Sequence, residues 1–150
     1  MLPQYKKILV PIDGSDEAFL AFKKAVTAAR DNDLRKLVLA HIIDTRTLQT
    51  PTGFDGDFTD EIIQQTQNIF NEYTQYAKEH GVDQIETVIE YGSPKTIISK
   101  DLPKRYNADL IMMGATGLNA VERLLIGSVS SYVICHAICD VLIVRTNEEN

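Results

Sequence analysis

The chain has 150 residues, of which 44% are hydrophobic and 24% charged, with 8 glycines and 5 prolines. This composition is that of an ordinary globular domain, and it excludes disordered, collagen-like and disulfide-scaffold classes. We expect one domain, spanning residues 1–150, around a single core. A net charge of -6 provides no diffuse positive field for nucleic acid or an anionic membrane. Any anionic ligand must therefore be held by local groups.

The subcellular location is predicted from features that the sequence lacks. Two cysteines, Cys135 and Cys139, do not make a disulfide framework, and residues 1–7 lack the apolar stretch of a signal peptide. No window is long and apolar enough for a membrane helix. We therefore expect a soluble, cytoplasmic protein with neither a nucleic-acid nor a membrane partner.

Five short apolar runs alternate with amphipathic segments along the chain. The runs are continuous rather than alternating, which is typical of strands buried on both faces of a parallel sheet. The predicted strands are residues 8–12, 37–43, 85–89, 110–113 and 141–144. The predicted helices are residues 16–31, residues 58–80, a segment from Ser93-Pro94 through Leu102, and a segment from Ser128 through Ile138.

This βαβαβαβαβ order predicts an α/β fold, a doubly wound five-stranded parallel sheet flanked by helices. Residues 44–56 form the longest connection without an apolar period, and a loop of that length is often functional. Ligands of such sheets bind outside the carboxyl ends of the strands, where the strand order reverses. The search for a site is thereby confined to the strand ends.

The first strand ends in an acidic segment, Asp13-Gly14-Ser15-Asp16. A carboxylate at this place could orient a ribose hydroxyl or hold a hydrated magnesium ion. The alternative is that Asp13 and Ser15 form a turn and that Ser15 or Asp16 caps the next helix.

The fourth strand ends in Gly114-Ala115-Thr116-Gly117, and Gly127-Ser128 follows after nine residues. Phosphate binding requires backbone N–H groups that a ligand can approach, which glycine allows, and the positive end of a helix dipole. Both features occur within fifteen residues. The alternative is that the glycines only turn the chain and that Ser128 is an N-cap.

This spacing resembles the pattern G-x-x-G-(nine residues)-G-[S/T] of the universal stress proteins. Further similar segments are residues 5–15, 40–44, 108–114, 127–130 and 141–144, so the likeness covers essentially the whole chain. The resemblance implies a flavodoxin-like α/β domain, usually a homodimer, that binds ATP in the branch carrying the glycine motif.

The resemblance also implies roles for individual residues. It assigns Asp13 to the ribose and the metal, the backbone of Ile42 to adenine, and Met113 with Gly114 to the nucleoside. The nucleotide-binding set is Pro11, Asp13, Ile42, Met113, Gly114, Gly117, Gly127, Ser128, Val129 and Ser130, with Asp13 also the metal ligand and the last five lying around the phosphates. Family members often have a basic residue just before the second glycine, where this chain has Thr116, and Arg123 is a possible substitute.

The resemblance further implies that residues 141–145 form an edge strand that pairs with a second copy. An exposed apolar edge otherwise invites uncontrolled association. The alternative is that Arg145 and the acidic tail protect the edge by charge.

Two functions remain open. The first is a nucleotide-responsive regulatory module of the stress response that holds ATP with magnesium, since no base, nucleophile or metal cluster accompanies the glycine motif. The second is a slow ATP hydrolase or phosphotransferase that uses Asp13 and magnesium. Cys135 and Cys139 are interpreted as core residues, and His41 as a hydrogen-bonded residue of the sheet.

Overall fold

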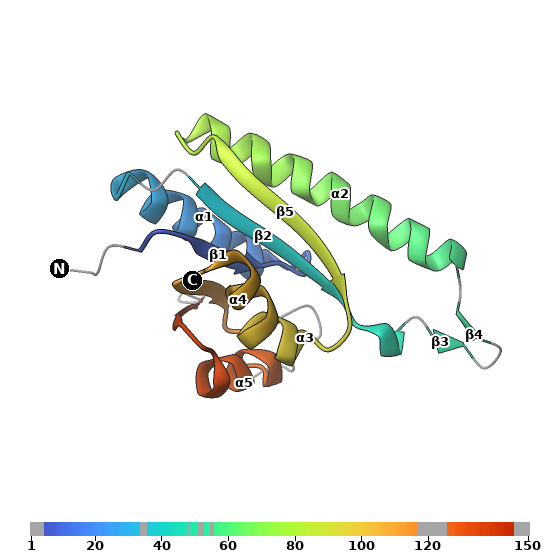
Figure 1. The fold of residues 1–150 in the computed structure, drawn as a ribbon. Helices are drawn as coiled ribbons and strands as arrows, with labels where there is room; N and C mark the ends of the chain where they lie inside the picture. The colour runs from blue at the N-terminus through green and yellow to red at the C-terminus, as the bar shows by residue number, and fades with distance from the viewer. Residues whose placement is uncertain are drawn as a thin grey trace, which may run out of the picture.

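A five-stranded sheet, in which every neighbouring pair of strands is parallel, forms the centre of the fold (Figure 1). The computed structural model describes residues 5–33, 36–47, 49–50, 53–54, 56–116 and 126–145. The strands of the sheet, in order, are β5 (Gln84–Tyr91), β2 (Lys36–Ile43), β1 (Ile8–Pro11), β6 (Leu110–Gly114) and β7 (Asp140–Val144). The single-domain α/β fold with a five-stranded parallel sheet is therefore confirmed. Flavodoxin itself has a different strand order, so the likeness to it lies in the doubly wound architecture.

Helices cover both faces of the sheet (Figure 1). Helices α1 (Asp16–Asp31) and α2 (Gly56–Glu79) pack over one face, and a core built around Phe22, Leu39 and Phe70 fills that side. The other face carries α3 (Pro94–Thr96), α4 (Leu102–Tyr106) and α5 (Ser128–His136).

Residues 94–106 form one helical segment that contains a π-helical turn, Ile97–Asp101. Pro103 has no N–H to donate to the preceding turn, so a carbonyl there is left without its usual intrahelical partner. The carbonyl of Ser99 accepts a hydrogen bond from the backbone N–H of Ile138 at 3.1 Å. This contact ties the chain after α5 to the α3–α4 segment.

The predicted connection at residues 44–56 contains structure that the sequence did not reveal. A 3-10 turn occupies Thr45–Thr47, and β3 (Gln49–Thr50) pairs antiparallel with β4 (Gly53–Phe54). Figure 1 shows this small hairpin projecting away from the sheet, beyond the end of β2. Two-residue strands carry too little apolar pattern to be recognised in a sequence.

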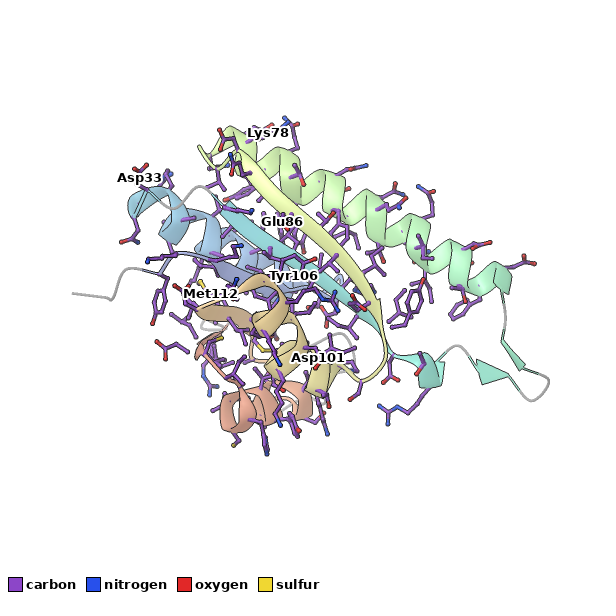
Figure 2. The ribbon with its side chains drawn as sticks, viewed as in Figure 1. Asp33, Lys78, Glu86, Asp101, Tyr106 and Met112 are labelled. Carbon is purple, nitrogen blue, oxygen red and sulfur yellow. The ribbon has the colours of Figure 1, made fainter. Side chains whose placement is uncertain are left out.

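The burial of the strands follows their place in the sheet. β1 and β6 are buried along their whole length, as the continuous apolar runs predict. β5 and β7 are edge strands with several half-buried or exposed residues, so the expectation of burial on both faces is wrong for these two. Figure 2 shows Met112 of β6 within the centre of the fold, and Asp33 and Lys78 near the ends of α1 and α2. No helix among the described residues is long and apolar enough to span a membrane.

Candidate functional site

The strand order reverses between β1 and β6, and these two strands part before either one ends. Their pairing is recorded at Ile8 with Leu110 and at Leu9 with Ile111, whereas β1 stays paired with β2 as far as Pro11. The N–H of Ile12 donates to the carbonyl of Ala40 in β2 at 2.8 Å. Successive residues of a strand direct their N–H groups to opposite neighbouring strands. The N–H of Ile12 faces β2, so an N–H at position 11, which proline lacks, would have faced β6. Pro11 thus favours the parting of the two strands at the reversal point.

The chain leaves β1 through a tight acidic turn. The Asp13 carboxylate accepts a hydrogen bond from the N–H of Ser15 at 3.0 Å, and Gly14 between them has a φ of +86° that favours glycine. The hydroxyl of Ser15 accepts from the N–H of Ala18 at 3.1 Å and is the N-cap of α1. The turn and cap interpretation is therefore confirmed for Ser15. Asp13 is half-buried at the carboxyl edge, where the sequence predicted it.

Tyr73 of α2 packs against aromatic residues of α1, the helix that follows this turn. The ring is buried, with its centroid 4.6 Å from that of Phe22 and 4.9 Å from that of Phe19. Burial raises the pKa of its hydroxyl far above the ordinary value, and the charge of Asp13 raises it further. The hydroxyl of Tyr73 therefore stays protonated, and α2 contributes no negative charge of its own from this residue.

The end of β6 packs directly on the first turn of α1. A Cβ placed on Gly114 would lie 3.1 Å from the Cβ of Glu17 and 3.2 Å from its carbonyl carbon and oxygen. Gly114 is thus a glycine for packing reasons that the sequence pattern did not distinguish from ligand approach. The Glu17 carboxylate also accepts a hydrogen bond from the backbone N–H of Thr116 at 3.0 Å.

The start of α5 is joined to the end of β6 by two hydrogen bonds. The N–H of Gly127 donates to the carbonyl of Ala115 at 2.7 Å, and the buried Ser130 hydroxyl donates to the carbonyl of Gly114 at 2.9 Å. The N-cap of α5 is Gly127, with no side-chain capping bond. The alternative in which Ser128 caps the helix is therefore wrong. Ser128 is the exposed first residue of α5, and Val129 follows it in the same turn.

Gly127 differs from Gly114 in how much space surrounds the position where a Cβ would lie. Its backbone has φ of −77° and ψ of 169°, which any residue adopts. Among the described residues, a Cβ placed there would contact the carbonyl oxygen of Ala115 at 3.4 Å and the Cα of Thr116 at 3.6 Å, both ordinary van der Waals distances. The described part of the fold therefore has little need for glycine at this position.

Ile42 and Met113 lie on the face of the sheet covered by α3, α4 and α5. Met113 is buried within that core, and half-buried Ile42 packs against it. Both are near the carboxyl ends of their strands, β2 and β6. Gly117 and Arg123 lie outside the described residues.

The predicted histidine and cysteine roles have mixed outcomes. A ring nitrogen of His41, Nδ1, is hydrogen-bonded to the carbonyl of Ile12 at 2.9 Å, which confirms it as a hydrogen-bonded residue of the sheet. Cys139 is half-buried, and burial raises the pKa of its thiol to about 11. Cys135 is exposed, so the prediction that it lies in the core is wrong. It lies in the last turn of α5, which ends at His136, on a face directed to solvent.

Two residues at this edge were not predicted from the sequence. Glu17 fitted an acidic first helical turn, which favours any carboxylate near the positive end of the dipole. Tyr73 fitted the apolar stripe of α2. Neither pattern contains a signal for the partner across the fold, Thr116 or Asp13.

The profile of the Universal stress protein family matches residues 4–145 of the chain. The chain belongs to this family. A Staphylococcus aureus (strain USA300) protein described as a universal stress protein is 48% identical over 144 residues, covering 96% of this chain and 86% of that protein.

Solved structures of universal stress proteins have the same fold. UspA from Lactobacillus plantarum matches with a TM-score of 0.86 at 33% identity, over 96% of this chain and all of that one (100%). A universal stress protein solved in complex with cAMP matches with a TM-score of 0.72 at 27% identity, over 97% and 100% of the two chains.

Proposed function

We propose that this universal stress protein binds an adenine nucleotide, ATP with magnesium, at the edge where β1 and β6 part, and acts as a nucleotide-responsive regulatory module in the cytoplasm. The observation that carries the proposal is Gly127, a glycine that no contact among the described residues requires, at the start of a helix without a side-chain cap. The uncapped turn offers backbone N–H groups to an anion, and glycine leaves them accessible. The relative solved with cAMP supports an adenine nucleotide as the ligand class.

We assign the remaining residues the roles that the family resemblance implies. Asp13 takes the ribose side, and Ile42 and Met113 border the base and nucleoside. The phosphates lie over the N–H groups of Ser128 and Val129, and the family resemblance assigns Gly117 to the phosphates as well. Ser130 contributes through its backbone, because its hydroxyl is already bonded to Gly114.

The acidic turn fits a magnesium ion that is carried by the nucleotide. Magnesium in nucleotide sites is usually bound by one or two carboxylates together with the phosphates, and it keeps several waters. Asp13 is a half-buried carboxylate at the edge where β1 ends. Bound magnesium would neutralise phosphate charge, which a chain of net charge -6 does not do by its overall field.

The alternative function is slow ATP hydrolysis or phosphotransfer with Asp13 and magnesium. Asp13 is the one proposed metal ligand, so both alternatives use the same site and differ only in turnover. Release of labelled phosphate from ATP, compared between wild type and Asp13→Ala, separates them. Release at the rate of the protein-free blank is expected, and Asp13-dependent release would establish the enzyme.

We propose that the protein assembles as a homodimer through β7 and the adjoining face of α5. Ile134, Ile138 and Leu142 expose 47%, 58% and 37% of their surfaces there, although they are large apolar residues. β7 is at the edge of the sheet, and no described strand pairs with its outer side. Pairing with a second copy would cover both features.

The proposed nucleotide site is tested by Gly127→Ala. One methyl group fits the fold at this position, so the melting temperature should stay within about 2 °C of wild type, because the cost is within about 0.5 kcal/mol. The methyl group lies between the end of β6 and the start of α5, so ATP affinity should fall at least about tenfold. Gly56→Ala, where a Cβ meets nothing within 4 Å, is the matched control. Equal ATP affinity in both variants would contradict the proposed site.

A further inference from the structure

Glu17 links the two sides of the proposed site. It belongs to the first turn of α1, directly after the acidic turn of Asp13, and its carboxylate accepts the N–H of Thr116 after β6 at 3.0 Å. The side chain is half-buried, so this hydrogen bond is partly shielded from water. The group that holds the first part of the loop after β6 is therefore an acid.

The backbone around this hydrogen bond leaves little freedom. Gly114 lies so close to Glu17 that a Cβ would contact its Cβ at 3.1 Å. Gly127 is bonded to Ala115, and Ser130 to Gly114. Glu17, the end of β6 and the start of α5 thus form one packed unit, and the carboxylate is held beside the end of β6.

The charges around Glu17 and the end of β6 are unfavourable for a nucleotide polyphosphate that carries no divalent cation. The Glu17 carboxylate occupies the Thr116 N–H, a donor that an anionic ligand could otherwise use. Asp13 and Asp16 lie on the same turn, and both carboxylates act on Tyr73. Thr116 adds no positive charge.

We propose that Glu17 is a specificity-determining residue that sets how much uncompensated phosphate charge the site accepts. This inference rests on the proposed nucleotide-binding function. Glu17 supports the loop by accepting the Thr116 N–H, and its negative charge penalises each phosphate charge that no divalent cation neutralises. The penalty is absent for adenosine, small for AMP, largest for ATP alone, and reduced for ATP with magnesium.

The test separates the hydrogen bond from the charge. Glu17→Gln keeps an acceptor oxygen for the Thr116 N–H and removes the charge, whereas Glu17→Ala removes both. Calorimetric titrations with adenosine, AMP, ATP in EDTA and ATP with magnesium are measured for each protein. Glu79→Gln is the matched control, because it makes the same change of charge at the far end of α2, next to Lys78 (Figure 2).

The expected result is a graded gain for Glu17→Gln. Affinity for ATP in EDTA rises about tenfold, as expected for a carboxylate and a phosphate charge at several ångströms in a partly buried site. The gain for AMP is smaller, and the affinity for adenosine changes less than about twofold. Glu79→Gln binds all four ligands as wild type does.

The contradicting results are distinct. If Glu17→Gln changes ATP and adenosine affinities by the same factor, or leaves ATP in EDTA unchanged, the charge has no role and the proposal is wrong while nucleotide binding stands. If Glu17→Ala alone weakens all ligands equally, Glu17 only supports the loop. If wild type binds none of the four ligands, the proposed function and this inference fail together.

Discussion

The hydroxyl of Ser130 donates a hydrogen bond of 2.9 Å to the carbonyl oxygen of Gly114, which joins the first turn of α5 to the last residue of β6. Ser130 is buried, with 4% of its surface exposed, so the bond is shielded from water. Gly114 lies at the edge where β1 and β6 have already parted. The bond therefore fixes the start of α5, which carries the proposed phosphate contacts, to the sheet.

Replacing Ser130 by alanine should weaken both the fold and nucleotide binding. Loss of one buried hydrogen bond lowers the free energy of unfolding by about 1 kcal/mol. The start of α5 also loses a tether, so ATP affinity should fall. Urea unfolding and calorimetry measure the two effects. Ser131→Ala is the neighbouring control, and equal stability of the two variants would show that the bond contributes nothing.

Gly114→Ala should be destabilising whatever the ligand. The added Cβ would lie 3.1–3.2 Å from the Cβ and backbone of Glu17, and backbone atoms there cannot move without shifting α1. Overpacking of this kind costs about 1–3 kcal/mol. Urea unfolding of Gly114→Ala without nucleotide, compared with Gly127→Ala, measures it. A stable Gly114→Ala protein would show that α1 can shift and that this glycine serves another purpose.

The sequence predicted the five strands of the main sheet to within two residues at either end and the first helix at both of its ends, because apolar runs and helical periodicity record burial directly. Exposure of β7 was not predictable, since residues 141–144 are as apolar as those of a central strand, whereas Glu86 and Thr87 within the run 85–89 were a signal of exposure in β5. In the site, the glycine spacing located the β6–α5 junction. It did not distinguish Gly114, which packs on Glu17, from Gly127, where the described residues leave room for a Cβ.

Local sequence patterns did not indicate which residues contact each other across the fold. The Glu17 and Thr116 pair is separated by 99 residues, and neither residue is unusual in its own segment. Tyr73 has the spacing of a core residue, and its ring contacts with Phe19 and Phe22 depend on how α2 packs on α1. Such contacts follow from tertiary packing rather than from periodicity.

The two cysteines should differ in their reactivity at alkaline pH. Burial, followed by the charge of Asp140, raises the pKa of Cys139 from 9.0 to about 11. A thiolate is the reactive form, so at pH 8 alkylation of folded Cys139 should be about a hundredfold slower than in the unfolded chain. Because the folded pKa is raised, the contribution of protonated Cys139 to the free energy of unfolding is fully present below pH 9. It is lost as the pH rises from 9 toward 11.

Peptide mass spectrometry after iodoacetamide treatment checks this prediction. Exposed Cys135 is the internal reference in the same sample. Equal labelling of both cysteines in the native protein, with urea giving no increase at Cys139, would contradict the burial of that thiol.

Leu142→Lys should convert the proposed dimer to monomers. The substitution places a charge on an exposed apolar residue of the edge strand, where Leu142 has 37% of its surface exposed. A lysine on an edge strand opposes pairing with another strand. Light scattering after size-exclusion chromatography measures the mass. Lys24→Glu, an exposed change on α1, is the control and should remain dimeric, whereas a monomeric wild type would contradict the assembly.

The central claim, that an adenine nucleotide binds where β1 and β6 part, is tested most directly by isothermal titration calorimetry of the wild-type protein with ATP and magnesium. The expected result is saturable binding with one nucleotide per chain, weakened by Gly127→Ala and unaffected by Gly56→Ala. No detectable heat of binding with ATP and magnesium, AMP or cAMP would contradict the claim and leave this chain with the family's fold alone.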